Sequence, residues 1–427
     1  MIDNKYTDLL FDNKMPNKYV EVPNVELSSE NNTGSYKKAL ILSKVSIDSG
    51  AGGTRVSNLV DLLDHCGCYE TSAYVFSKGK KLGDVIKQNK HSKFVALDDY
   101  SGLTGIKKYK KLFYNKKTVK KIIDFEKPDV VIIYSVLSFR NISFIKKYTK
   151  KKKIKLVFDV VESRKLFSSF SPFAFFGYNL HNYLINHFYI DKKTVGVICP
   201  TYYLRDFFEN KRKCKCVFVF PITMKVNLLP KYSKESSIDK IIFLYAGNPA
   251  NKRDLMINTI KGFNLLPNEL KNKIIFIICG PTSDFLIEHE GLSINDYQAS
   301  LDFTLYLGTI DKNKLYNLYR NVDYSVLLKN PTKRFSKAGF PTKMAECFAC
   351  AIPMVANLSG DMKYYMKDGF NSIVSENTTP ESFKEALVRA ITLSNSNHQV
   401  LSKNALQTAK TKLDNSIFYQ DFYNFIK

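Results

Sequence analysis

The stretch with the clearest potential for chemistry is a basic turn followed by a helix-forming run, residues 329–353. A helix is predicted to begin near Thr342, with Lys343 in its first turn and Glu346 three residues later. A lysine in a first helical turn opposes the helix dipole, which favours an anion bound at that N-terminus. The Glu346 carboxylate is reachable from the same ligand and can accept hydrogen bonds from two neighbouring hydroxyls. Phosphate donors and a diol acceptor within one helical turn indicate a nucleotide.

A second stretch, residues 245–254, places Gly247 directly after an apolar run and adds two adjacent cations, Lys252 and Arg253. Two cations at a helix start are costly to pack and useful for binding a diphosphate. The alternative is a helix that simply begins with solvated charges.

A third stretch, residues 50–54, is rich in glycine and follows the first apolar run of the chain. Glycines after a strand let backbone N–H groups approach an anion at a helix N-terminus. The pattern is neither G-x-G-x-x-G nor a Walker A loop. A glycine-rich turn that serves only close packing between strand and helix is an equal alternative.

These stretches lie between short apolar runs of strand length that alternate with amphipathic segments. Continuous apolar strands separated by helices predict parallel sheets covered on both faces, in which ligands bind beyond the carboxyl ends of the strands. The predicted strands are 38–43, 72–76, 93–97, 128–134, 155–159, 195–199 and 216–220, and then 240–247, 274–279, 303–307, 324–328, 353–356 and 372–374.

A polar break divides the two sets of strands and predicts two Rossmann-like domains of α/β class. The predicted divisions are an N-terminal extension over 1–36, a first domain over 37–230, a linker over 231–239, a second domain over 240–395, and C-terminal helices over 396–427 that can return to the first domain.

The composition excludes several classes of protein. With 427 residues, 44% hydrophobic residues and 24% charged residues, the chain can form two ordinary cores, so disorder, collagen and a small disulfide scaffold are excluded. The net charge of +24 is concentrated in residues 1–235, which hold 42 Lys and Arg against 22 Asp and Glu. A polyanion or an anionic surface is therefore implicated, and DNA, RNA and anionic lipid all satisfy this electrostatic argument. A solvated lysine face is the plainer alternative.

The N-terminus lacks the pattern of a secretory signal, so a cytoplasmic protein is expected. Residues 166–190 contain no charged side chain but nine aromatic ones together with several Ser, Asn and His. The segment is too polar to cross a membrane and suits either an acceptor pocket or membrane interface, or an ordinary buried helix. The acceptor-side candidates are Glu162, His181 and His187.

Residues 338–356, AGFPTKMAECFACAIPMVA, together with Gly247, Lys252, the glycine-rich first loop and the order of elements, resemble family 4 glycosyltransferases of GT-B fold. The resemblance covers roughly residues 38–420. It implies two tandem doubly wound Rossmann-like domains that face each other across a cleft, the first for the acceptor and the second for the nucleotide-sugar donor. It also implies transfer that retains the anomeric configuration and needs neither metal nor other cofactor. The sequence contains no Asp-x-Asp, in agreement with this.

The resemblance assigns Glu346 to the ribose hydroxyls and Lys252, helped by Arg253, to the donor diphosphate; these three are the implied catalytic residues. The residues implied to bind the donor are Gly52, Gly53, Gly247, Gly308, Ile310, Arg334, Gly339, Phe340, Pro341, Thr342 and Lys343. Three departures bear on sugar recognition: the first Glu of the family's E-x7-E motif is Ala338, an expected Arg is Asn248, and no His follows the strand that ends at Tyr134.

The resulting expectation is a retaining hexosyl- or N-acetylhexosaminyltransferase that uses a UDP- or GDP-sugar to extend a lipid-linked glycan in cell-surface polysaccharide, lipopolysaccharide or capsule synthesis. Its lysine-rich first domain would associate with the inner face of the plasma membrane, and nucleic acid is not an expected partner. The alternatives are a non-catalytic GT-B relative that binds nucleotide or glycan as a scaffold, and a basic nucleic-acid-binding protein. The sugar, base, acceptor, linkage and oligomeric state stay open.

Overall fold

The computed structural model of the chain describes residues 36–47, 50–97, 116–134, 138–163, 179–194, 196–234, 238–249 and 253–427. The described residues form two compact units. The N-terminal unit comprises residues 36–223 with Lys337–Phe340 and Asn415–Lys427, and the C-terminal unit comprises Met224–Ser336 and Pro341–Asp414. Of the extension predicted over residues 1–36, all but Tyr36 lie outside the described residues.

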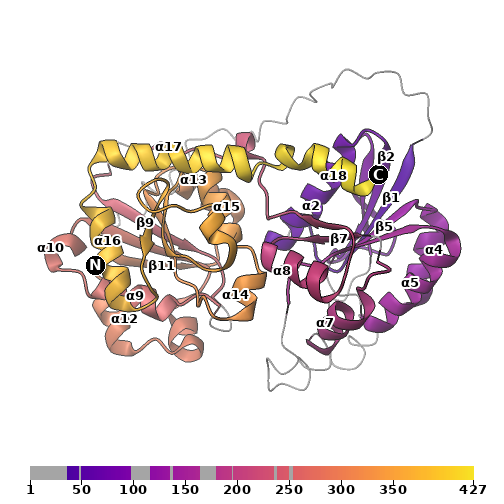
Figure 1. Cartoon of the computed structure of the whole chain (residues 1–427). Helices are drawn as coiled ribbons and strands as arrows, with labels where there is room; N and C mark the ends of the chain where they lie inside the picture. The colour runs from indigo at the N-terminus through magenta and orange to yellow at the C-terminus, as the bar shows by residue number, and fades with distance from the viewer. Residues whose placement is uncertain are drawn as a thin grey trace. The chain divides into compact units, whose positions relative to one another are not determined.

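The sheet of the N-terminal unit has the order β3-β4-β2-β1-β5-β6-β7-β8. Its strands β1, β2, β5 and β7 are labelled in Figure 1. All neighbouring strands are parallel except the edge pair β3 and β4. The predicted parallel sheet is confirmed, whereas β3 was missed because it is only four residues long and three of the four are exposed. The strands are β1 (Lys37–Ser43), β2 (Tyr69–Val75), β3 (Val85–Gln88), β4 (Ser92–Ala96), β5 (Val130–Tyr134), β6 (Lys155–Asp159), β7 (Gly196–Cys199) and β8 (Val217–Val219).

Helices cover both faces of this sheet, because successive side chains of each buried strand point to opposite sides. Ala39 and Ile41 of β1 pack with α2 and α18, while Leu40 and Leu42 pack with α4, α5 and α8. The helical segments are α2 (Gly50–His65), α4 (Lys116–Glu126), α5 (Phe139–Lys152), α7 (Leu180–Leu184), η2 (Ile185–Tyr189), α8 (Tyr202–Asp206), η3 (Phe207–Lys211), η7 (Asn415–Phe418) and α18 (Tyr419–Ile426).

The glycines at 52 and 53 lie inside the first turns of α2, which corrects the expectation that they form a loop. A Cβ built on Gly53 would lie 2.2 Å from the carbonyl oxygen of Ile47, and one on Gly52 would lie 2.5 Å from Cγ1 of Val45. Both positions therefore need glycine because the helix packs directly against the segment that leaves β1. Close packing accounts for both glycines.

The C-terminal unit holds a parallel sheet of order β11-β10-β9-β12-β13-β14. Its strands are β9 (Ile241–Ala246), β10 (Ile274–Cys279), β11 (Thr304–Gly308), β12 (Tyr324–Leu327), β13 (Met354–Asn357) and β14 (Ser372–Ser375). All six were predicted to within two residues, because each is a buried apolar run that Gly, Pro or charged residues end.

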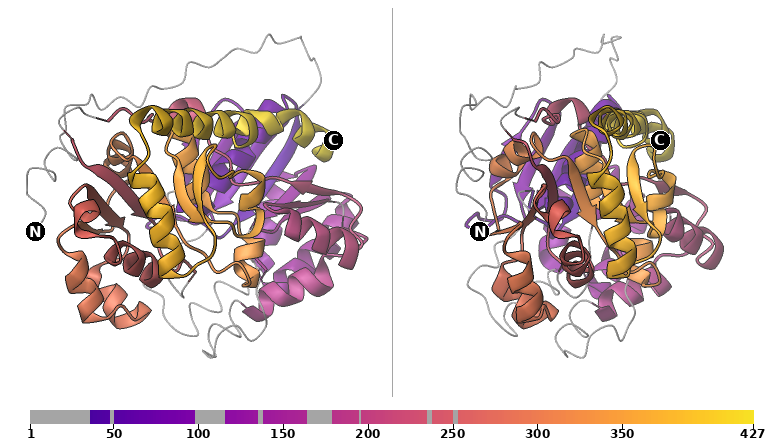
Figure 2. Two further views of the ribbon diagram at one scale, coloured as in Figure 1. Left: turned by 60° about the vertical axis from the view of Figure 1, so that its left-hand side comes forward. Right: turned by 90° about the vertical axis from the view of Figure 1, so that its left-hand side faces the viewer.

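The helices of this unit pack along the sheet, with α9 and α16 side by side on one face (Figure 2). Phe263 of α9 meets Phe383 of α16 edge to face, with ring centroids 6.0 Å apart. The helical segments are η4 (Val226–Leu228), α9 (Met256–Asn264), α10 (Asn268–Lys271), α11 (Ser283–Phe285), η5 (Leu286–Glu290), α12 (Ile294–Ser300), α13 (Lys312–Tyr319), α14 (Arg334–Ala338), α15 (Thr342–Ala349), η6 (Gly360–Tyr364), α16 (Pro380–Ile391) and α17 (Asn395–Lys412).

Among the residues that the structure describes, no helix combines the length and the apolar character needed to cross a bilayer. All eight cysteines are free thiols.

Candidate active site

Three glycines lie next to one another at the carboxyl edge of the C-terminal sheet, and together they are called the glycine ledge here. Gly247, Gly280 and Gly308 follow or end the adjacent strands β9, β10 and β11, and all three have positive φ angles. The backbone N–H of Gly280 donates to the carbonyl of Gly308 at 2.7 Å, and a Cβ on Gly280 would lie 2.0 Å from the carbonyl oxygen of Gly247. The ledge is free of side chains because any Cβ there would clash or strain the backbone.

Beside this ledge, one buried carboxylate holds two lysines. Asp254 forms an ion pair with Lys343 of α15, and its other oxygen lies 3.4 Å from Nζ of Lys329. The hydroxyl of Tyr245 also donates to Asp254 at 2.8 Å, and the Lys343 ammonium lies 4.0 Å from the centre of the Tyr245 ring. The side chain of Asp254 is 6% exposed, against 16–17% for the two lysines. Together the carboxylate and its two lysines carry a net charge of +1.

The electrostatics of this cluster follow from burial and pairing. Burial acts to raise the pKa of the Asp254 carboxyl, but Lys343, Lys329 and the Tyr245 hydroxyl outweigh it and hold that pKa below its usual range. Burial lowers the pKa of Lys343, and Asp254 opposes this effect. Burial also raises the pKa of Tyr245, so its hydroxyl stays protonated and donates.

The backbone of Lys329 is held firmly in place. Lys329 follows β12, and its N–H donates to Oδ1 of Asn357 at 2.8 Å while its carbonyl accepts from Nδ2 of Asn357 at 2.9 Å. Asn357 is 3% exposed and ends the neighbouring strand β13. The amide therefore clamps the start of the loop that carries Lys329.

Glu346 lies one turn along α15 from Lys343 and is bonded to a neighbour that the sequence did not suggest. The buried hydroxyl of Tyr319, at the end of α13, forms a hydrogen bond with the Glu346 carboxylate. Burial raises the pKa of Glu346, and Lys312, Tyr319 and Lys343 counteract the rise. Glu346 as a whole residue is half-buried.

The remaining donor-side predictions are placed as follows. Lys252 lies outside the described residues, while Arg253 is half-buried next to Asp254. Ile310 packs on the core beneath the loop after β11, two residues beyond Gly308. Pro341 and Thr342 begin α15, and Arg334 begins α14.

Four predicted positions group with the N-terminal unit. Gly339 and Phe340 belong to the segment Lys337–Phe340, and Gly52 and Gly53 lie in α2. In that same unit Ala338 is fully buried in the core, and its carbonyl accepts a hydrogen bond from Thr201 at 3.2 Å. A buried alanine thus occupies the position at which the family motif has its first glutamate.

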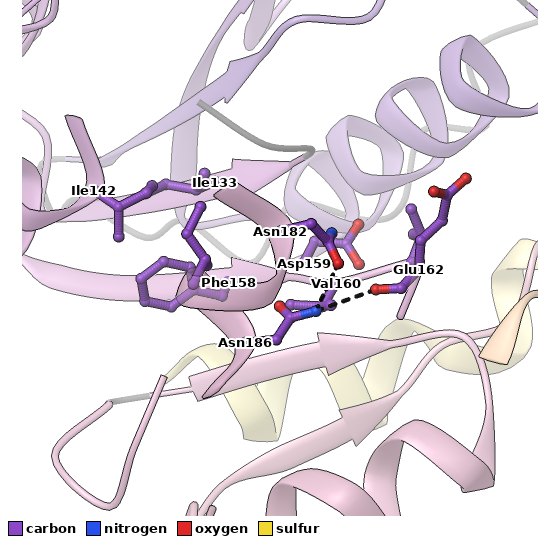
Figure 3. Close-up of a pocket in the computed structure, with 10 residues that line it drawn as sticks. Ile133, Ile142, Phe158, Asp159, Val160, Glu162, Asn182 and Asn186 are labelled. Atoms are coloured by element: carbon purple, nitrogen blue, oxygen red, sulfur yellow. Dashed lines mark hydrogen bonds between the residues drawn. The ribbon is translucent and has the colours of Figure 1, made fainter. Parts of the chain in front are cut away.

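Of the acceptor-side candidates, Glu162 lines a small pocket in the N-terminal unit, whereas His181 and His187 are not among its lining residues (Figure 3). Asp159, the last residue of β6, and Glu162, three residues later, line the pocket with Asn182 and Asn186. The amide of Asn186 donates to Oδ1 of Asn182 at 3.2 Å and to the Glu162 carbonyl at 3.3 Å. In Figure 3 the carboxylate of Glu162 points away from Asn186. Glu162 therefore takes part in this network through its backbone carbonyl and not through its carboxylate.

The two histidines lie in different surroundings. His181 is 2% exposed, and its Nδ1 accepts from the backbone N–H of Phe139 at 3.4 Å. Burial lowers the pKa of His181 to about 4, with further lowering by Lys44 and Arg140. His187 is half-buried and stacked on Tyr183 at a centroid distance of 4.1 Å. His181 is therefore neutral at physiological pH and acts as a hydrogen-bond acceptor.

Within the described part of the chain, no group of three or more His, Cys, Asp or Glu side chains is arranged to hold a metal ion. The site also contains residues that were not predicted from the sequence, namely Tyr245, Asp254, Gly280, Tyr319, Lys329 and Asn357. One signal was available for Lys329, since a lysine directly after a buried parallel strand lies at the ligand-binding edge.

Residues 230–408 match the family described as Glycosyl transferases group 1, which covers most of the C-terminal unit. No curated protein matches the sequence.

Solved structures match almost the whole chain. Sucrose-phosphate synthase from Thermosynechococcus elongatus has a TM-score of 0.72 at 14% identity, covering 91% of this chain and 98% of its own. Anabaena HepE in complex with UDP and glucose has a TM-score of 0.63 at 12% identity, covering 92% and 99%. The lipopolysaccharide outer core galactosyltransferase WaaB has a TM-score of 0.59 at 13% identity, covering 91% and 99%.

The chain therefore has the GT-B fold, with two Rossmann-like α/β units, and the predicted fold class is confirmed. The match of residues 230–408 to glycosyl transferases group 1 supports a nucleotide-sugar glycosyltransferase.

Proposed function

We propose that this protein is a retaining glycosyltransferase that moves a hexosyl or N-acetylhexosaminyl group from a UDP- or GDP-sugar to a hydroxyl of a lipid-linked glycan. Its place is cell-surface polysaccharide synthesis. The membership of family 4 and the independence from metal are parts of the same proposal. They rest on residues 338–356 and on the fixed cations at the sheet edge.

The observation that carries the proposal is the carboxyl edge of the C-terminal sheet. The glycine ledge leaves room for a flat base and ribose, the Glu346 carboxylate suits the ribose diol, and Lys329 and Lys343 stand beside Asp254 where a diphosphate would lie. These groups gather at one edge because β9, β10, β11 and β12 are neighbouring parallel strands. HepE binds UDP and UDP-glucose in its solved complexes, which supports a nucleotide at this fold.

The chemistry required is heterolysis of one bond and formation of another. The bond between the anomeric carbon and the phosphate oxygen breaks, and its electron pair stays on the phosphate. The acceptor hydroxyl forms the new bond from the same face, and its proton passes to the departing phosphate oxygen. Fixed lysines and the N-terminus of α15 stabilise the growing negative charge, with Lys252 and Arg253 as further donors.

The acceptor side is assigned to the N-terminal unit. Glu162 lines the small pocket together with Asn182 and Asn186, and neutral amide groups suit sugar hydroxyls. His181 and His187 belong to the same helical segment as the two asparagines. WaaB acts on lipopolysaccharide outer core, and the likeness of fold supports a glycan acceptor.

A basic face on α4 and α5 supports association with an anionic membrane. The two helices lie side by side, and Tyr148 of α5 bonds to Asp124 of α4. Phe125 is 75% exposed on this face. Its exposed lysines are Lys116, Lys117, Lys120, Lys121, Lys147, Lys150, Lys151 and Lys152. Lysines around an exposed aromatic suit lipid headgroups at the cytoplasmic leaflet.

The proposal is tested by offering the full chain a panel of UDP-, GDP- and ADP-sugars in a thermal-shift assay, then measuring release of nucleoside diphosphate with a lipid-linked glycan. We expect one nucleotide class to raise the melting temperature and to be turned over, with activity lost in Lys252→Ala and Glu346→Gln. Binding without turnover by any glycan would favour the scaffold alternative. Binding of nucleic acid but of none of the nucleotides would contradict the proposal.

A further inference from the structure

The two lysines at the sheet edge share a single carboxylate, and this arrangement has more positive charge than a structural ion pair requires. Asp254 is almost fully buried and offers one oxygen to Lys343 and the other to Lys329. One lysine would neutralise the carboxylate, so the ion pair with Asp254 does not by itself account for the second lysine. A buried excess charge is costly unless another group compensates it.

Hydrogen bonds to neighbouring segments fix the backbone of Lys329 in place. Its backbone is clamped by both polar atoms of the Asn357 amide, and an isolated β-bridge joins it to Asp254. The backbone N–H of Leu255 also donates to the carbonyl of Leu328 at 2.8 Å. The loops after β9 and β12 are thus tied together at the point where the two charges meet, so Lys329 is held near Asp254 before any ligand arrives.

We propose that Lys329 binds the diphosphate of the donor together with Lys343, and that Asp254 is a positioning residue that holds both ammonium groups at the sheet edge. This inference rests on the proposed nucleotide-sugar site and adds to it a direct phosphate contact by Lys329 and a positioning role for Asp254. The Lys343 ammonium is held between Asp254 and the face of Tyr245, whereas Lys329 makes the longer, 3.4 Å contact and turns more readily toward a phosphate oxygen.

The test compares nucleoside diphosphates with their nucleosides, since only the former carry the phosphates. Affinities of UDP, GDP, uridine and guanosine are measured by calorimetry on the full chain and on Lys329→Met, Lys329→Arg and Lys273→Met. Lys273 precedes β10, so it lies at the amino edge of the same sheet and controls for lost charge. We expect Lys329→Met to weaken diphosphate binding about ten- to one-hundredfold with nucleoside binding unchanged. Lys329→Arg should stay within a few-fold of the wild type, and Lys273→Met should match it.

The positioning role has its own readout. Removing the Asp254 charge leaves two lysines facing each other, so one loses its proton at a lower pH. In Asp254→Asn the loss of diphosphate affinity at alkaline pH should begin at a lower pH than in the wild type. A merely structural carboxylate would weaken binding equally at every pH.

The outcomes separate the two levels of the proposal. If the wild type binds neither UDP nor GDP, the proposed function fails. If it binds one of them and Lys329→Met binds it equally well, the function stands and the role of Lys329 is refuted. If Lys329→Met weakens nucleoside and diphosphate binding alike, the lysine is structural and the inference is likewise overturned.

Discussion

The side chain of Lys343 occupies the space that any side chain on Gly247 would need. A Cβ built on Gly247 would lie 2.1 Å from Cε of Lys343 and 2.6 Å from its Nζ. The φ angle of Gly247 is also +151°, a region that L-residues rarely adopt. The glycine at the end of β9 therefore makes room for the ammonium that lies over Tyr245 and pairs with Asp254.

We predict that Gly247→Ala displaces Lys343 and weakens nucleoside diphosphate binding at least tenfold. The matched control is Gly291→Ala, because Gly291 also has a positive φ but a Cβ placed on it would meet nothing within 4 Å. Both variants carry backbone strain of about 1 kcal/mol, and only the first carries the clash. Calorimetric titration with UDP and GDP measures the effect, and equal affinities in the two variants would contradict the prediction.

Glu346→Gln should weaken nucleoside and nucleoside diphosphate binding by the same factor, about tenfold, because the carboxylate is assigned to the ribose and not to the phosphates. Tyr319→Phe should weaken both by a smaller factor, since it removes a hydrogen bond to Glu346 without removing the carboxylate. Calorimetry with uridine and UDP, or with guanosine and GDP, checks the prediction. A selective loss of diphosphate binding in Glu346→Gln would reassign the residue.

His181 should make stability fall between pH 7 and pH 4. Its pKa is about 4 in the folded chain and about 6.5 when unfolded, so the unfolded state takes up a proton first as pH falls. The neutral ring contributes its full stability above pH 6.5, and about 3 kcal/mol of it is lost by pH 4. Urea unfolding of the wild type and His181→Asn at pH 7 and pH 4.5 isolates this contribution. Parallel pH dependences in the two proteins would refute it.

Arg55→Met should destabilise the N-terminal unit by about 3–5 kcal/mol. The Arg55 guanidinium is fully buried, forms two hydrogen bonds with Asp159, and donates to the carbonyls of Phe220 and Pro221. Its removal leaves a buried carboxylate uncompensated, and Arg55→Met with Asp159→Leu should recover part of the loss. Urea unfolding measures both, and a double variant no more stable than the single one would contradict the mechanism.

Membrane association should depend on the basic face and not on net charge. Replacing Lys147, Lys150 and Lys151 by Gln should weaken binding to anionic vesicles about one-hundredfold, at about 1 kcal/mol for each lysine. The control replaces Lys78, Lys80 and Lys81, which are exposed in the same unit between β2 and β3 and remove the same charge. Flotation with and without phosphatidylserine gives the readout. Equal losses in both triple variants would show a net-charge effect.

Local sequence patterns were sufficient to predict the fold and part of the site. The alternation of buried apolar strands with amphipathic helices indicated two parallel sheets. Each strand and each covering helix is recognised from the spacing of its own apolar residues, which is a local property of the sequence. The run from Thr342 to Glu346 was recognisable for the same reason, since Lys343 and Glu346 lie within one helical turn and Lys343 opposes the helix dipole. Gly52 and Gly53 show the limit, because a loop and a tightly packed helix start have the same local pattern.

The packing of distant helices and strands decides which charged side chains lie in contact. Asp254, Lys329 and Lys343 are separated by up to 89 residues in the chain, and they come together because β9 pairs with β12 and α15 returns over the same edge. Strand order and register set such contacts, and neither is encoded in the periodicity of a single strand. The same holds for Tyr319 beneath Glu346 and for Ala338 in the N-terminal core. The key charged residues were visible in the sequence, but their partners were products of the fold.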